Sequence, residues 1–522
     1  MTQPTAHARE STFSLDSQRR TAPARAADGR AHGQHRLSIG LHFLIAVSCL
    51  AALVVIIRTE TLEEMASYPT GVLGATAALF CVGTISSMVL IRRIPHAGLD
   101  AFDPGLLMVL FVFGSIAPVI VTGAFGDPLL RFQDVRLEPL LPKVVMLHLI
   151  LIVAFAATYH LVNRKIRPAA STGSNRLNSV PVWVLLAIVI ATVSFSIEAA
   201  SNVLFTRAMG DSMDISREYL QSTGLTAQQG IQLLRRMRAY AIVFALGVLA
   251  CRAATPRGAL RILVLTVPAL GLAYFTIFAS RGFLISTMLG AAAFVDAAKF
   301  KGNLLTKKTL AIGFVGGIAM LQVMDAAESF AVYGRRPSAS DLRLATVLDY
   351  GIVENSALIV NWIDSGTEAH WNGSSYSTAV FSVLPAQIRG PITDLPRWFV
   401  RLAEPEEAEM GKGRGFSAVA EGYLNWGAAG VAIQGAILAL LASVIRFFRV
   451  SRRLGALGPY LFAASLPLSY TLFRMDVSGV LSRLKNYAIE VPILVGVAIL
   501  MIAIARRSPS HRRAGASFRR LA

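Results

Sequence analysis

The chain has 522 residues, of which 54% are hydrophobic and only 16% are charged. Its apolar residues form repeated runs long enough to cross a bilayer, which excludes a soluble multidomain protein and indicates a polytopic helical membrane protein. The formal net charge of +19 would favour nucleic acid in a soluble chain. In a membrane protein, basic cytoplasmic loops account for such a charge, so we expect no nucleic-acid partner.

Residues 1–37 are polar and lack an apolar core, so we expect a disordered cytoplasmic tail and not a signal peptide. Apolar runs of roughly 17 to 21 residues follow, each long enough for about 30 Å of hydrocarbon. They predict an all-α fold with about twelve transmembrane helices, near residues 38–57, 71–91, 105–123, 143–162, 179–198, 238–252, 262–280, 282–298, 309–327, 427–445, 458–473 and 487–505.

The basic residues set the orientation of these spans. With the N-terminus inside, clusters such as Arg92/Arg93, Lys307/Lys308 and Arg452/Arg453 all fall on one side, as the positive-inside rule requires. Both termini are then cytoplasmic, and residues 506–522 form a basic cytoplasmic tail. Residues 38–328 hold the first nine predicted helices, and residues 427–505 hold the last three.

Between these two blocks lies a long polar segment, residues 329–426, which this orientation places in the periplasm. A loop of this length is usually either functional or disordered. This one contains too many aromatic residues for a spacer, among them Trp362, Trp371 and Trp398. We therefore expect a large folded periplasmic cap over the outer ends of the helices.

Many arginines at the outer ends of the spans are not needed for orientation; they are Arg281, Arg335, Arg336, Arg389, Arg397, Arg414 and Arg474. The run 262–298 must form a tight hairpin with Arg281 at its outer tip. An arginine at membrane depth costs roughly 2.5 to 3.5 kcal/mol, so it usually faces a cavity or an anionic partner. The alternative is that Arg281 reaches lipid phosphates as an ordinary anchor.

Ser417, Glu421 and Asn425 share one face if their segment is helical, because they are spaced four residues apart. Glu421 is then either an interfacial residue paired with an arginine or a catalytic carboxylate. His370 is the one histidine in the large loop. It is either a surface residue or a base.

Short patches of this sequence resemble the Wzy-type oligosaccharide repeat-unit polymerases of the bacterial inner membrane. The patches are Ser280–Gly282, Val383–Ile392, Gly413–Gly430 and Phe473–Asp476. The most specific is Glu-Gly-Tyr-Leu-Asn-Trp-Gly at Glu421–Gly427. The layout, with a large outer loop before the last three spans, is also similar to that family.

The resemblance implies a GT-C-like glycosyltransferase that polymerises undecaprenyl-pyrophosphate-linked oligosaccharides at the periplasmic face, without a metal or another cofactor. Its partners would be that lipid-linked oligosaccharide, membrane lipid and, as a further candidate, a chain-length regulator protein. A pyrophosphate leaving group needs concentrated positive charge, which arginine supplies in a bidentate fork. An acceptor hydroxyl needs a general base, for which Glu421 is the first choice and His370 the second. The expected substrate-binding residues are Arg281, Arg335, Arg336, Arg389, Arg414, Arg474, Asp476, Tyr423 and Asn425.

Two other functions remain open at this point. A ligase that moves a finished glycan to lipid A or another acceptor would use nearly the same site. A twelve-span flippase or transporter would instead place polar residues along the middle of several spans, and those middles are mostly apolar here.

Overall fold

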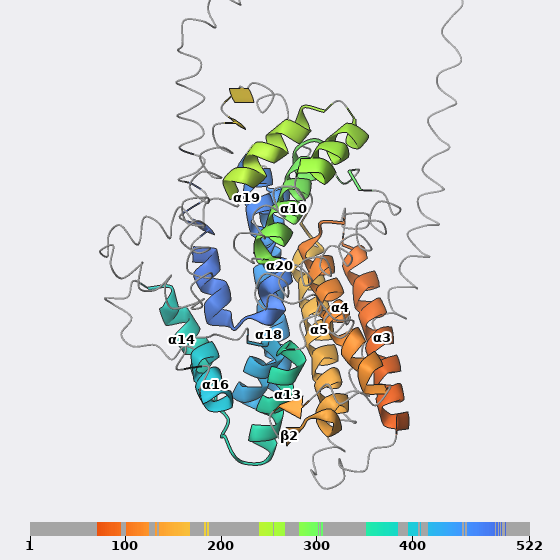
Figure 1. Ribbon diagram of the computed structural model, residues 1–522, viewed down its shortest axis with the longest axis vertical. Helices are drawn as coiled ribbons and strands as arrows, with labels where there is room; N and C mark the ends of the chain where they lie inside the picture. The colour runs from red at the N-terminus through yellow and green to blue at the C-terminus, as the bar shows by residue number, and fades with distance from the viewer. Residues whose placement is uncertain are drawn as a thin grey trace, which may run out of the picture.

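The computed structural model describes part of the chain. The described residues are 70–94, 101–124, 131–132, 135–166, 182–183, 185–186, 240–253, 255–266, 281–300, 302, 304–305, 351–384, 395–405, 408, 416–451, 454, 457–485, 487–488, 490, 492 and 496. Within these ranges the fold is helical (Figure 1), apart from one antiparallel pair of two-residue strands, β1 (Arg131–Phe132) and β2 (Val135–Arg136).

The chain up to residue 300 contributes α3 (Thr70–Arg92), α4 (Pro104–Ala124), the 3₁₀ turn η1 (Glu138–Leu140), α5 (Leu141–Asn163), α10 (Arg281–Val295) and the π-helical turn η3 (Asp296–Phe300). The chain beyond that point contributes α13 (Gly351–Asp364), α14 (Ser374–Ser382), α16 (Leu395–Ala403), α18 (Ala418–Val450), α19 (Leu457–Ser465), α20 (Leu468–Thr471) and the 3₁₀ turn η5 (Leu472–Arg474).

Three helices of the described part, α3, α5 and α18, are long and apolar enough to cross a membrane. Two shorter apolar helices, Pro104–Ile120 and Tyr240–Cys251, coincide with further predicted spans. The expected helical membrane fold is thus confirmed. The predicted spans at 38–57 and 309–327 lie outside the described residues, so the full set of about twelve stays a prediction, as does the GT-C-like arrangement.

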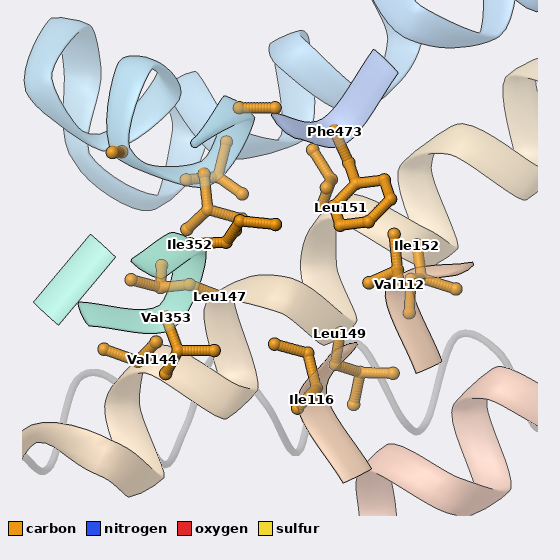
Figure 2. Close-up of a cluster of buried hydrophobic side chains, with 14 of the residues drawn as sticks. Val112, Ile116, Val144, Leu147, Leu149, Leu151, Ile152, Ile352, Val353 and Phe473 are labelled. Carbon is orange, nitrogen blue, oxygen red and sulfur yellow. The ribbon is translucent and has the colours of Figure 1, made fainter. Parts of the chain in front are cut away.

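The central helix of the molecule is α5, which packs against α3, α4, α13 and α18. It is buried nearly along its whole length because its sequence is apolar on every side. Figure 2 shows Val144 and Leu147 of α5 beside Ile352 and Val353 of α13. A helix of the long polar segment therefore packs against the first turns of a membrane helix.

A second apolar core lies between residues 240–251, α10 and α19. Phe244, Phe294 and Tyr460 meet there edge to face, with ring centroids 5.3 to 6.3 Å apart. The contact between α18 and α19 joins this core to the one around α5. The long helix α18 is thus shared by both halves of the bundle.

The end of α18 that is predicted to be cytoplasmic is fixed by ion pairs. Arg449 Nη2 lies 2.7 Å from Asp296 Oδ2, and Arg446 Nη1 lies 3.8 Å from Asp103 Oδ2. Asp296 also accepts hydrogen bonds from the backbone N–H groups of Gly302 and Leu304. Buried carboxylates need such partners, because burying an unpaired charge costs several kcal/mol. These contacts hold α18 against η3 and against the residue just before α4.

Candidate functional site

Residues 418–426, which were expected to precede a membrane span, are the first part of the long helix α18. Ser417 caps it, with its Oγ accepting from the N–H groups of Val419 and Ala420. The predicted span begins at residue 427, within α18, and the point at which α18 enters the membrane stays a prediction. The polar residues of its first turns are buried by contacts with other segments.

Helix α18 is kinked at Trp426 and Gly427. Gly427 has φ 58° and ψ −143°, which is close to a region that only glycine occupies readily. The kink interrupts the hydrogen-bond ladder, so the last carbonyl groups of the first helical half need other donors.

The loop just before α14 supplies these donors. The N–H of Trp371 donates to the carbonyl of Leu424 at 2.9 Å, and the N–H of Asn372 donates to the carbonyl of Asn425 at 3.2 Å. The N–H of Gly373 donates to Asn425 Oδ1 at 3.0 Å. Two segments some fifty residues apart in the sequence are thereby joined at the kink.

Glu421 lies at the centre of this junction and is fully buried. Its Oε1 accepts from Ser375 Oγ at 2.8 Å, and its Oε2 accepts from Gln434 Nε2 at 2.9 Å and from the N–H of Val477 at 2.8 Å. Three hydrogen bonds from the protein offset the desolvation of this buried group. Glu421 thus ties α14, the second half of α18 and the turn after η5 together.

Asn425 lies one helical turn after Glu421, and its Nδ2 donates to the Glu421 carbonyl at 2.8 Å and to Ser375 Oγ at 2.7 Å. The predicted shared face of Glu421 and Asn425 is confirmed. Asp476, which is 5% exposed, precedes Val477 and so lies beside Glu421. Burial and the nearby Glu421 carboxylate raise the pKa of the Tyr376 phenol well above its usual value.

His370 lies on the outside of the same junction and is exposed. Its Nδ1 is 3.3 Å from the carbonyl oxygen of Leu424. A carbonyl only accepts, so Nδ1 carries the hydrogen, and in the neutral ring Nε2 then holds the lone pair. Trp426, 39% exposed, stacks on Tyr376 with ring centroids 5.4 Å apart. The exposed side of the kink therefore presents an imidazole and an indole.

Tyr423 faces another way, into a buried ion pair. Its hydroxyl donates to Asp364 Oδ1 at 2.6 Å, and Lys143 Nζ donates to Asp364 Oδ2 at 2.6 Å. Lys143 is only 2% exposed, and its ammonium lies 5.3 Å from the centre of the Tyr423 ring. This group joins the start of α5, the end of α13 and the first half of α18.

Of the arginines predicted to bind substrate, Arg474 is the one whose side chain the structure describes. Its guanidinium donates to the Tyr470 hydroxyl and lies 4.8 Å from the centre of that ring. Arg281 begins α10, but its side chain lies outside the description. Arg335, Arg336, Arg389 and Arg414 lie outside the described residues. Convergence of these arginines on one pyrophosphate therefore stays a prediction.

Sequence reasoning missed Ser375, Gln434, Lys143 and Asp364. Gln434 could have been noticed, because a polar residue inside an apolar span usually has a specific partner. No local signal pairs Lys143 with Asp364, which are 221 positions apart. Ser375 lies in a serine-rich turn, and nothing in that turn indicates its carboxylate partner.

Comparison with known proteins gives one match. Residues 385–507 match the family model described as O-antigen polysaccharide polymerase Wzy. Neither the curated proteins nor the solved structures contain a match to the chain. The matched segment includes α18, with Glu421 and its kink, and the turn at Asp476, whereas His370 and α14 precede it. Over residues 385–507 the chain is therefore similar to the Wzy-type family of O-antigen polysaccharide polymerases.

Proposed function

We propose that this protein polymerises oligosaccharide repeat units linked to undecaprenyl pyrophosphate, at the periplasmic face of the bacterial inner membrane. The family match supports repeat-unit polymerisation in general. The observation that carries the finer proposal is the junction at the α18 kink. There, an exposed histidine with an Nε2 lone pair lies over a buried network that joins three parts of the chain.

In the proposed reaction, the acceptor hydroxyl of a new repeat unit gives its proton to a base on the protein. Its oxygen bonds to the anomeric carbon of the growing chain, and the bond from that carbon to the pyrophosphate breaks. Undecaprenyl pyrophosphate leaves with the bonding electron pair. We assign the stabilisation of this leaving group to Arg281, Arg335, Arg336, Arg389, Arg414 and Arg474, whose permanent charge makes a metal unnecessary.

We assign the base to His370 in preference to Glu421. A general base must reach its proton directly or through one water molecule. His370 is exposed and oriented by Leu424, whereas Glu421 has no exposed surface and accepts three hydrogen bonds from the protein. We propose that Glu421, Tyr423, Asn425 and Asp476 act on the glycan indirectly, by holding the kink and its loop in place.

Two matched variants test this assignment in a strain that lacks the native gene. His370→Gln removes the base and should lower the polymerisation rate by roughly 10²- to 10⁴-fold. Glu421→Gln should keep most of the polymer, because its amide oxygen still accepts from Gln434 and Val477 while the Ser375 hydroxyl turns to accept. The glycan ladder on a gel and the amount of protein in the membrane are measured together.

The pattern of the gel separates the possible results. Single repeat units that accumulate in the His370→Gln strain support polymerisation with His370 as the base. Loss of polymer in Glu421→Gln at a normal protein level would move the base to Glu421 and leave the polymerase function intact. Long carrier-linked chains in the deletion strain would contradict a polymerase and indicate a ligase.

A further inference from the structure

Helix α14 belongs to the long polar segment, yet both of its ends are tied to one stretch of the last helices. At its first turn, Ser375 shares the Glu421 carboxylate with Val477. At its last turn, the Ser382 carbonyl accepts a hydrogen bond from Lys485 Nζ at 3.3 Å. Residues 477–485 are helical. Helix α14 therefore runs beside them and in the same direction.

This direction leads toward the middle of the bundle. Lys485 follows Val477 by eight positions, which is about 12 Å along a helix. Val477 shares the Glu421 carboxylate with Gln434 of α18, whereas Leu484 packs on the apolar cluster that contains Ile445 of α18. The C-terminal end of α14, which meets Lys485, consequently lies level with the part of α18 between Gln434 and Ile445. In Figure 1, α14 is drawn alongside the bundle and not beyond its end.

The exposed side chains of α14 change from polar to apolar toward its C-terminal end. Ser374 and Ser377, in its first turns, are exposed and polar. At and just beyond its last turn, Val380 is 65% exposed, Phe381 54%, Val383 41% and Leu384 39%. Removing apolar surface from water is favourable by about 25 cal/mol of free energy per Å², so such a continuous exposed patch is unfavourable in water. A gradient from polar to apolar is what a helix entering a bilayer from its surface requires.

We propose that α14 is a re-entrant helix whose apolar end, formed by Val380, Phe381, Val383 and Leu384, is immersed among the hydrocarbon chains of the bilayer. The backbone permits this, because a helix satisfies its own polar groups and the Ser382 carbonyl is taken by Lys485. Part of the segment 329–426 then lies within the membrane, next to the Glu421 junction. This inference rests on packing and exposure and does not depend on the polymerase function.

The test is spin labelling of the full chain in proteoliposomes, with the three cysteines replaced by alanine. Labels at Val380 and Phe381 are compared with a label at Ser377 on the same helix. Leu440 of the spanning helix α18, 51% exposed, is the lipid reference, and the exposed Thr367 is the aqueous one. Collisions with oxygen, which concentrates in lipid, and with a water-soluble nickel chelate are measured.

Labels at Val380 and Phe381 should collide with oxygen as often as the label at Leu440 does. They should collide with the nickel chelate severalfold less often than the label at Thr367 does. A nickel accessibility equal to that of Thr367 would place the patch in water and overturn the proposal. Low accessibility to both reagents would also overturn it, because a protein partner would then cover the patch. Two positions are labelled so that the test remains valid if one variant folds poorly. Thermal melting of each labelled protein checks that it is folded.

Discussion

Lys143 is a charged residue at a position where the sequence predicts a membrane helix, and its burial has a clear physical basis. Its ammonium lies 2.6 Å from Asp364, whose other oxygen accepts from Tyr423. Removing one partner of a buried ion pair leaves an uncompensated charge, which typically costs about 3–5 kcal/mol. The pair also fixes where α13 meets α5. It therefore helps to decide how the polar segment sits on the bundle.

Lys143→Met should lower the stability of the detergent-solubilised protein by roughly 3 kcal/mol, because Asp364 would lose its counter-charge. The matched control is Arg401→Met on the exposed face of α16, which should change stability by less than about 0.5 kcal/mol. Thermal melting followed by size-exclusion chromatography measures both. Equal melting of the two variants would show that the Lys143–Asp364 contact contributes nothing to stability.

At the scale of residues, the sequence predicted relative positions within one helix better than contacts between distant segments. The spacing of Glu421 and Asn425 was enough to place them on one face, because helical geometry is local. The donors to Glu421 come from α14, from the far side of the kink and from the turn after η5. No pattern in a single sequence pairs such distant groups, so the three donors to Glu421 could be identified only from the fold.

At the scale of elements, continuous apolar composition predicted the helices well. The spans expected at 71–91, 105–123 and 143–162 correspond closely to α3, α4 and α5. The span expected at 427–445 covers only the later part of α18, because the first turns of this helix carry polar side chains whose partners lie elsewhere in the chain. Composition also gave no sign of the kink. Gly427 looked like the start of a span, although its positive φ marks an interruption within a helix.

The kink brings the two halves of α18 into close backbone contact. A Cβ on Gly430 would overlap the carbonyl oxygen of Gly422, and a Cβ on Gly422 would lie 2.7 Å from the Cα of Val431. Neither neighbour is a flexible side chain, so the backbone itself would have to move. Small residues therefore permit the geometry that exposes Trp426 and places the His370 loop.

Gly430→Ala should destabilise the protein by roughly 1–3 kcal/mol, since overpacking against backbone forces a shift of the kink. Gly114→Ala in α4 is the matched control, because a Cβ there meets nothing within 4 Å. Alanine is a better helix former than glycine by up to about 1 kcal/mol, so the control should melt at the same temperature or higher. A Gly430→Ala protein that melts like the control would contradict the tight approach at the kink.

At the scale of the whole molecule, charged contacts mark the two opposite ends of the central bundle. Lys143 and Asp364 lie at the start of α5, and the pairs made by Arg446 and Arg449 hold the far end of α18. Helix α5 has 23 residues and is therefore about 34 Å long, enough for roughly 30 Å of hydrocarbon. Segments attached to its two ends should lie on opposite sides of the membrane.

Two reporter insertions test this arrangement and the orientation together. Gly366 lies in an exposed turn just after Asp364, and Lys165 is exposed at the other end of α5. The basic side of the bundle is predicted to be cytoplasmic, so alkaline phosphatase inserted after Gly366 should be active and the same insertion after Lys165 inactive. A cytoplasmic fluorescent reporter at the two positions should give the reverse pattern. If phosphatase is active only after Lys165, the Glu421 junction and His370 face the cytoplasm. A periplasmic polymerisation site is then untenable, because the lipid-linked acceptor would have to approach from the other side.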